Sequence, residues 1–149
     1  MLPGIAIQPR GRAEGGDHRP PVVLKLFAST SARDTDFTAK LVDVRPGGTA
    51  FNVVDGVTLA RFRESLSQPT LVTPGEVVEY AIDMWSTSHM FLPAHRIRLT
   101  ITSSDFPRYD RNPNTGNDSG TDTVPQKAEQ TIFHDARFAS HVVLPIIPD

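Results

Sequence analysis

The sequence HRIRLTIT, residues His95–Thr102, is the clearest strand pattern in the chain. Its apolar residues Ile97, Leu99 and Ile101 occupy every second position, and arginines and threonines fill the positions between them. Successive side chains of a β-strand point to opposite faces of a sheet, so this alternation is typical of a strand with one buried face. The pattern therefore predicts a β-strand that packs one side on a core.

A loop with unusual composition follows directly, SSDFPRYDRNPNTG, Ser103–Gly116. Its prolines fix φ at about −65°, and its asparagines and glycine favour turns. The loop also carries aromatic and arginine side chains, a mixture that is rare in a solvent-exposed linker. We therefore expect it to pack on its own sheet, to cover a neighbouring domain or to bind a ligand. The candidate contact residues are Phe106, Arg108, Tyr109, Arg111, Asn112 and Asn114.

The rest of the chain also favours short strands. It has 149 residues, with 13 prolines and 10 glycines that interrupt long helical periods. Alternating apolar patterns predict further strands at Val22–Ala28, Phe37–Val44, Ala50–Val54, Glu76–Trp85, Gln130–His134 and His141–Leu144. Strands of this length, separated by turn signals, predict an all-β fold, an antiparallel β-sandwich or jelly roll.

Three segments do not follow this regular pattern. Asp55-Gly56 is a turn signal that should end the strand before it. Val57–Leu66 fits both helical and alternating spacing, so periodicity alone leaves its structure open. In residues 1–20, glycine and proline break every period, which predicts a flexible lead-in to a domain spanning residues 21–149.

Composition excludes several functional classes. The formal net charge is −2 and the pI is about 6.2, so nothing in the charge balance favours nucleic acid or an anionic membrane surface. The absence of cysteine excludes disulfides, thiolate metal sites and cysteine nucleophiles. No apolar run approaches the roughly 20 residues that a membrane-spanning helix needs. With no secretory pattern at the N-terminus, a cytoplasmic location is favoured, although the compartment is not fixed.

The chain lacks the main motif of a serine hydrolase. The nucleophile elbow requires Gly-x-Ser-x-Gly, and the nearest match, GNDSG at Gly116–Gly120, places its serine one position too late. Residues of the triad types are present, but such residues are common and mean little without geometry. They include Ser104, Asp105, His134, Asp135 and His141. No catalytic residue is therefore predicted.

Metal binding is not indicated either. Asp110, Asn112 and Asn114 are spaced like the first three ligands of an EF-hand loop, but Thr115 stands where the loop glycine belongs. The five histidines lack the spacing of a zinc site, and we expect them to be hydrogen-bonded or exposed. The loop side chains are expected to satisfy their own backbone, and no metal or cofactor is predicted.

Carbohydrate binding and domain contact are alternative uses of a β-sandwich surface. Trp85 and Tyr109 could stack on a sugar ring, whereas Tyr80 falls on the apolar face of its strand. A set of arginines is predicted to lie on strand faces and on the loop, where it forms a solvated surface or an inter-domain contact. The set consists of Arg61, Arg63, Arg96, Arg98, Arg108 and Arg111.

Several longer segments resemble a known family. They are DTDFTAKLVDV (Asp34–Val44), FNVVDGVTLARFRES (Phe51–Ser65), TPGEVVEYAIDMWSTSHMF (Thr73–Phe91), HRIRLTITSSDFPRYDRNPNTG (His95–Gly116) and SHVVLPIIP (Ser140–Pro148). Together they resemble the C-terminal domain of the X-Pro dipeptidyl-peptidase and cocaine-esterase-like serine hydrolases, over about residues 21–148. The resemblance implies that Val57–Leu66 is a strand.

The resemblance also carries functional expectations. Proteins of this family combine an α/β-hydrolase domain, which holds the catalytic Ser, Asp and His, with a jelly roll similar to galactose-binding folds. This chain would then be the non-catalytic part of a hydrolase that acts on peptides after proline, or on esters and amides. It would pack on the α/β-hydrolase domain. The alternative is an independent carbohydrate- or ligand-binding module.

One part of the family pattern is not matched. The family's jelly roll begins upstream of the segment that corresponds to Val22–Ala28, and residues 1–20 do not resemble those strands. The resemblance therefore implies a sandwich that lacks its first strands. Unpaired strand edges and uncovered apolar surface would favour self-association, or a partner chain that supplies the hydrolase domain.

Overall fold

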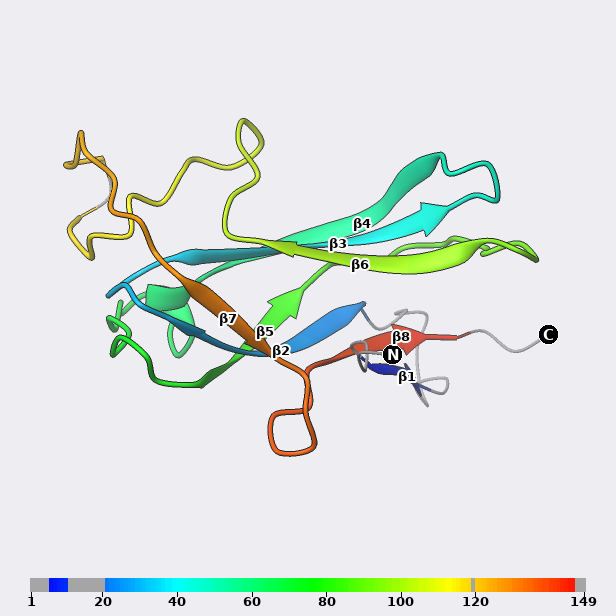
Figure 1. Cartoon of the computed structure of the whole chain (residues 1–149), viewed down its shortest axis with the longest axis horizontal. Helices are drawn as coiled ribbons and strands as arrows, with labels where there is room; N and C mark the ends of the chain where they lie inside the picture. Colours follow the sequence, from blue (N-terminus) through cyan, green and yellow to red (C-terminus); the bar gives the residue numbers. More distant parts are fainter. Residues whose placement is uncertain (1–5, 11–20, 119, 147–149) are drawn as a thin grey trace.

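The computed structural model describes residues 6–10, 21–118 and 120–146, which form two β-sheets packed face to face (Figure 1). The strands are β1 (Ala6–Arg10), β2 (Val23–Thr30), β3 (Asp36–Val44), β4 (Ala50–Leu59), β5 (Val78–Asp83), β6 (Arg96–Thr102), β7 (Gln130–Phe133) and β8 (His141–Pro145), with a 3-10 turn, η1, at Ala60–Phe62. The predicted all-β sandwich is confirmed, whereas its assignment to galactose-binding-like folds stays a prediction.

The two sheets differ in size. The five-stranded sheet has the order β1-β8-β2-β5, and β7 also pairs with β2. Its pairs are antiparallel except β1 with β8, which is parallel. The three-stranded sheet has the order β4-β3-β6 and is antiparallel throughout. Figure 1 shows this sheet lying over the five-stranded one, with the loop that follows β6 rising on the far side of it.

The core lies between the two sheets. Leu24 and Leu26 of β2 face it from one layer, and Phe37 and Leu41 of β3 face it from the other, all at most 1% exposed. The rings of Phe37 and Tyr80 meet across the layers at 4.9 Å between centroids. Burying a large apolar side chain contributes roughly 1.5–3 kcal/mol. Hydrophobic burial between the sheets is therefore what holds the two layers together.

Most predicted strands are present, with ends within two residues of those predicted. The exception is the region around Asp55-Gly56, which was predicted to be a turn and lies inside the continuous strand β4. Gly56 is required by a close backbone contact with β5 and not by a turn. A Cβ atom built on Gly56 would lie 2.2 Å from the carbonyl oxygen of Asp83, so only glycine lets β4 approach β5 this closely.

The expectation of a strand through Val57–Leu66 is only partly right. The strand ends at Leu59, and η1 follows it. Two long-range hydrogen bonds impose the change, since the N–H of Ala60 donates to the carbonyl of Thr35 and the N–H of Arg61 donates to Asp34. The chain therefore turns away from the sheet because of two residues that lie before the whole β3–β4 hairpin.

The N-terminal segment also differs from its prediction. Ala6–Arg10, within the predicted flexible lead-in, forms β1 and pairs in parallel with β8. The partner comes from the other end of the chain, so no local pattern could indicate it. The rest of the predicted lead-in, residues 1–5 and 11–20, lies outside the described residues.

Candidate functional site

A buried ion pair lies where the loop after β6 meets the sandwich. Asp34 is 1% exposed and Arg61 is 8% exposed. The Nε of Arg61 donates to Oδ2 of Asp34 at 2.7 Å, and the backbone N–H of Arg61 donates to Oδ1 at 3.1 Å. Arg61 also donates to the carbonyl oxygen of Asn117 at 2.7 Å. This guanidinium therefore joins the turn before β3, the end of β4 and the tract after the loop.

Asn112 completes the same cluster from the loop. Its Nδ2 donates to Oδ2 of Asp34 at 2.9 Å and to Oδ1 of Asp36 at 2.8 Å. Its own Oδ1 accepts the backbone N–H of Asn114, whose side chain donates to the carbonyl of Gln126. Both asparagines were predicted as contact residues of the loop, and here their side chains form hydrogen bonds within the domain. They anchor the loop to the body of the sandwich.

The burial of Asp36 perturbs its protonation. Burial raises the pKa of Asp36 from 3.8 to about 6, with a smaller increase from neighbouring Asp34 that the hydrogen bond from Asn112 and the charge of Arg61 oppose. Between pH 3.8 and about 6, this carboxyl group is therefore mainly protonated in the folded state and mainly ionised in the unfolded state. This carboxyl group therefore stabilises the fold below pH 4, and that contribution is lost as the pH rises through about 6.

We expect Asp36→Asn to remove this pH dependence. Asparagine keeps an oxygen that can accept from Asn112 but carries no charge. Because a shift of one pKa unit is about 1.4 kcal/mol, the variant should exceed the parent in unfolding free energy by up to about 3 kcal/mol at pH 7.5. The two proteins should be similar at pH 4. Urea unfolding at both pH values measures the difference, and Asp110→Asn, at an exposed loop position, is the control. Parallel pH profiles for parent and Asp36→Asn would contradict the assignment.

The tip of the loop presents an aromatic and arginine surface. Phe106 is 56% exposed, and the guanidinium carbon of Arg111 lies 4.4 Å from the centre of its ring. Arg108 is held by Asp55 of β4, with 3.1 Å between Nη2 and Oδ2. The Tyr109 hydroxyl also reaches this carboxylate, at 3.5 Å. These contacts fix the loop over the outer side of the three-stranded sheet while leaving Phe106 accessible.

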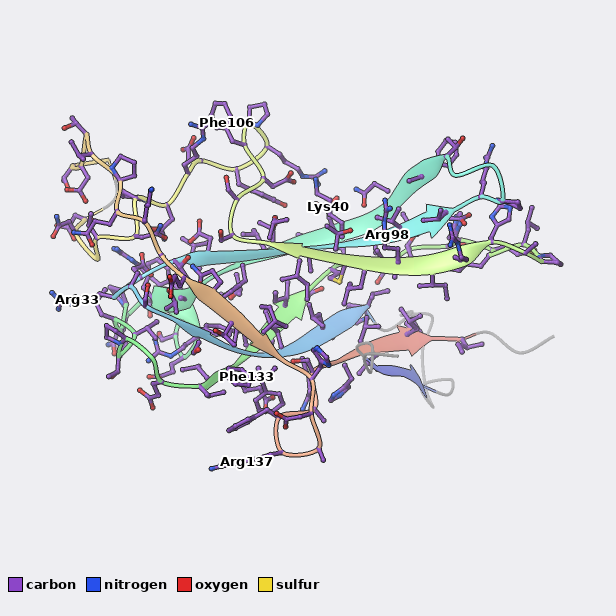
Figure 2. All side chains as sticks on the ribbon, viewed as in Figure 1. Arg33, Lys40, Arg98, Phe106, Phe133 and Arg137 are labelled. Atoms are coloured by element: carbon purple, nitrogen blue, oxygen red, sulfur yellow. The ribbon has the colours of Figure 1, made fainter. Side chains whose placement is uncertain are left out.

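A further ion pair holds the base of this loop. The Nζ of Lys40 on β3 lies 2.6 Å from Oδ1 of Asp105. Figure 2 shows Phe106 at the tip of the loop, and Lys40 and Arg98 near the three-stranded sheet below it. Leu41 and Leu99 pair with each other and pack on the core. Lys40 and Arg98 are their neighbours in sequence, and successive side chains of a strand point to opposite faces, so both point away from the core.

The six predicted surface arginines do not form one set. Arg96 and Arg98 are exposed on β6, and Arg108 and Arg111 lie in the loop above the same sheet. Arg61 is instead buried against Asp34. Arg63 donates to the carbonyl oxygen of Ala60 at 3.0 Å and lies 3.2 Å from Glu64. The surface set therefore reduces to four residues, which we call the arginine face: Arg96, Arg98, Arg108 and Arg111.

A second buried carboxylate lies at the other end of β3. Asp43, which is 4% exposed, accepts from Nδ1 of His95 at 2.8 Å and from Nε2 of His89 at 3.0 Å. Burial opposes ionisation of Asp43, but the hydrogen bonds and charge of the two histidines outweigh it and lower the pKa of this carboxyl group. Both histidines are hydrogen-bonded, as predicted. They tie the segment between β5 and β6 to the three-stranded sheet.

The residues of triad type have other partners. Asp105 pairs with Lys40, and the carboxylate of Asp135 accepts the backbone N–H groups of Arg137 and Phe138. The Nδ1 of His141 donates to the carbonyl oxygen of Ala139. None of these contacts joins a histidine to a serine. In residues 21–118 and 120–146, no three histidine or acidic side chains are arranged to bind a metal.

The two aromatic residues considered for sugar stacking lie on different layers. Trp85 is 72% exposed and follows β5 of the five-stranded sheet. Tyr109 is half-buried beside Asp55 on the three-stranded sheet. Tyr80 is 1% exposed in the core, as predicted from its strand face. The structure therefore does not combine these rings into one stacking platform.

The comparison with known families identifies the fold. Residues 21–143 match the family described as the X-Pro dipeptidyl-peptidase C-terminal non-catalytic domain. The chain belongs to this family. The predicted relationship and the prediction of a non-catalytic β-sandwich domain are both confirmed.

Individual relatives of this C-terminal domain are much longer proteins. The chain is 50% identical over 128 residues to cocaine esterase of Rhodococcus sp. (strain MB1 Bresler), covering 85% of this chain and 22% of that protein. A crystal structure of an aminopeptidase from a marine sediment Thaumarchaeota archaeon matches with a TM-score of 0.72 and 34% identity, over 81% of this chain and 22% of that one. A selenomethionine-labelled α-amino acid ester hydrolase matches with a TM-score of 0.76 and 32% identity, over 83% and 22%. The chain thus spans about a fifth of the length of these relatives.

Sequence reasoning missed the two buried carboxylate clusters of this X-Pro dipeptidyl-peptidase C-terminal domain. Asp34 stands in a polar stretch that reads as a turn, and Asp43 is an ordinary polar residue at the end of a strand. Their only local signal is that Asp34, Asp36 and Asp43 flank the apolar segment of β3.

No helix among the described residues is long and apolar enough to cross a membrane.

Proposed function

We propose that this domain serves a serine hydrolase without taking part in its chemistry, by packing on an α/β-hydrolase domain through the arginine face and Phe106. The hydrolase would act on peptides after proline, or on esters or amides. Membership of a family described as non-catalytic supports the first part of the proposal. The short span of the chain relative to its relatives supports a further domain as the partner.

The single observation that carries the choice of surface is the anchored loop. Asn112, Lys40 and Asp55 each hold a different point of the loop against the sandwich. The exposed ring of Phe106 under Arg111 is therefore presented in one arrangement before a partner arrives. Little conformational entropy is then lost on binding, and aromatic and arginine side chains are the types enriched at binding hot spots.

The charge of this surface indicates the chemistry of the partner. Arg96, Arg98 and Arg111 form no ion pair with any described residue, and the guanidinium of Arg111 lies over the ring of Phe106. A partner surface with acidic side chains around an apolar pocket would match both features. The carbohydrate alternative has less support, because Trp85 and Tyr109 belong to different layers.

We expect Phe106→Ala combined with Arg111→Ala to weaken binding to the hydrolase domain by roughly 30-fold or more, since losing a hot spot costs about 2 kcal/mol or more. The measurement is isothermal titration of this chain into an α/β-hydrolase domain that carries Gly-x-Ser-x-Gly, expressed as a separate polypeptide. Leu66→Ala, at a leucine that is 92% exposed elsewhere, is the matched control and should bind like the parent.

Activity assays test the other half of the proposal. The chain alone should not turn over a chromogenic ester or an X-Pro substrate. Turnover that a serine-directed inhibitor abolishes would overturn the non-catalytic assignment. Equal affinity of the double variant and the parent for the hydrolase domain would overturn the choice of surface.

A further inference from the structure

The second half of the loop after β6, residues 111–117, has few backbone contacts with the rest of the domain. None of these residues belongs to a strand. Among the described residues, their one backbone–backbone hydrogen bond outside the segment joins the carbonyl of Pro113 to the N–H of Gln126, in the tract that follows. Segments with few backbone hydrogen bonds open locally at a lower free-energy cost than a sheet. The attachment of residues 111–117 to the sandwich therefore depends strongly on side chains.

Two hydrogen-bonded anchors join this segment to the body of the sandwich. The Nδ2 of Asn112 donates to Asp34 at 2.9 Å and to Asp36 at 2.8 Å. Arg61 donates to the carbonyl oxygen of Asn117 at 2.7 Å. Both anchors end on the same three charged residues of the sandwich, which are at most 8% exposed. A change in the charge of this buried group therefore acts directly on the attachment of the segment.

Asp36 is the carboxyl group of this cluster that has no cation. The guanidinium of Arg61 is paired with Asp34 at 2.7 Å, and no ion pair joins Asp36 to any described residue. The two carboxyl groups lie side by side, because both accept from the one amide nitrogen of Asn112. With both ionised, two negative charges would stand against one positive charge in a buried site, which is costly.

The other neighbours of Asp36 supply no compensating charge. Leu59 of β4 stands opposite it, and Gln130 at the start of β7 donates to the adjacent Thr35. The loop contributes the neutral amide of Asn112. Burial accordingly raises the pKa of Asp36 from 3.8 to about 6. Water would hydrate the ionised carboxylate if residues 111–117 moved away, so ionisation favours the open arrangement.

We propose that residues 111–117 form a pH-sensitive latch, which is closed when Asp36 is protonated and opens more readily when Asp36 is ionised. Opening breaks the hydrogen bonds of Asn112 to the two carboxyl groups and the bond of Arg61 to Asn117. The carboxyl group is protonated more readily in the closed state than in the open state. It therefore stabilises closure below pH 3.8, and this contribution is lost as the pH rises through about 6.

The latch would also change the surface that carries Phe106. Asp105 and Arg108, nearer to β6, are held by separate ion pairs with the three-stranded sheet, so the base of the loop stays attached. Arg111 lies within the latch, with its guanidinium over the ring of Phe106. Opening would remove Arg111 from this position. This consequence for a binding partner rests on the proposed function, whereas the latch itself does not.

Hydrogen exchange of the Asn112 side-chain amide from pH 4 to pH 7 tests the latch, because its Nδ2 donates to both carboxyl groups. After correction for intrinsic exchange, its protection factor should fall by roughly 50-fold over this range, since the opening constant follows protonation of Asp36 at 3.8 in the open state and about 6 in the closed state. The exposed side-chain amide of Asn52, which donates to Asp55, is the control and should keep a constant protection factor.

Two variants and a urea series separate the latch from a general loss of folding. Asp36→Asn keeps an acceptor for Asn112 but cannot ionise, so the protection factor of Asn112 should no longer change with pH. Asp110→Asn, at an exposed position outside the latch, should behave like the parent. Exchange at Asn112 should also be insensitive to low concentrations of urea, because a local opening exposes little surface.

Three results would each overturn the latch. They are a protection factor of Asn112 that does not change with pH in the parent, a fall with pH that Asp36→Asn retains, and exchange that urea accelerates as much as global unfolding. These measurements use the chain without a partner. They are therefore distinct from the titration with the hydrolase domain, which alone tests the choice of binding surface.

Discussion

Replacing Gly56 by alanine should abolish most of the stability of this domain. The added Cβ would lie 2.2 Å from the carbonyl oxygen of Asp83, 3.0 Å from its carbonyl carbon and 3.1 Å from the Cα of Met84. All three atoms are backbone, so no side-chain rotation can relieve the clash. Relief requires β4 and β5 to separate, which opens the core between the two sheets. We expect a loss of more than about 3 kcal/mol in the free energy of unfolding, at the upper end for overpacking.

Gly47→Ala is the matched control for this prediction. It makes the same chemical change in the turn between β3 and β4, where a Cβ meets nothing within 4 Å. Thermal unfolding followed by circular dichroism should show a stability close to the parent for Gly47→Ala and little folded protein for Gly56→Ala. Similar melting temperatures for the two variants would show that β4 and β5 are not in this contact.

Replacing Arg61 by methionine should have the second large effect. Methionine keeps much of the side-chain volume but leaves the carboxylate of Asp34, which is 1% exposed, without its charged partner. Removing one member of a buried ion pair typically costs 3–5 kcal/mol, because the remaining charge stays desolvated. The variant also loses the hydrogen bond to the carbonyl of Asn117. We therefore expect a loss of roughly 3 kcal/mol or more.

The chain offers an exposed ion pair for comparison. Lys25 and Glu79 lie 3.5 Å apart across β2 and β5, with side chains 48% and 46% exposed. Lys25→Met should change the unfolding free energy by about 1 kcal/mol or less, because surface pairs are solvated and screened. Urea unfolding of both variants measures the contrast. Equal effects would mean that the Asp34–Arg61 pair is open to water rather than part of the buried cluster.

Much of the fold could be predicted because a half-buried strand has a recognisable pattern in its own residues. The alternation in β6, β3 and β5 depends only on which side chains face the core, and that pattern is written in consecutive residues. The family was also identified from the sequence, because five segments resemble X-Pro dipeptidyl-peptidase C-terminal domains. The candidate loop was identified from its composition, and its engagement with the sandwich agrees with one of the expectations for it.

The errors share one physical cause. Asp55-Gly56 has the composition of a turn, but the contact of Gly56 with Asp83 makes it the middle of a strand. The helical turn at Ala60 depends on Thr35 and Asp34, and β1 depends on β8. In each case the deciding partner is far away in the chain, and propensity is overridden by a contact that only the folded state contains.

The sequence by itself determined the class of fold, the family and the absence of a nucleophile elbow, because each of these is carried by neighbouring residues. Only the tertiary structure decided which polar side chains are buried and which surfaces remain open. Asn112 and Arg61 look like surface residues in the sequence, yet both are held by Asp34 inside the domain. Phe106 and the edge of β6 stay exposed instead. The burial of a side chain depends on how the two sheets pack, and this packing brings together residues that are far apart in the sequence.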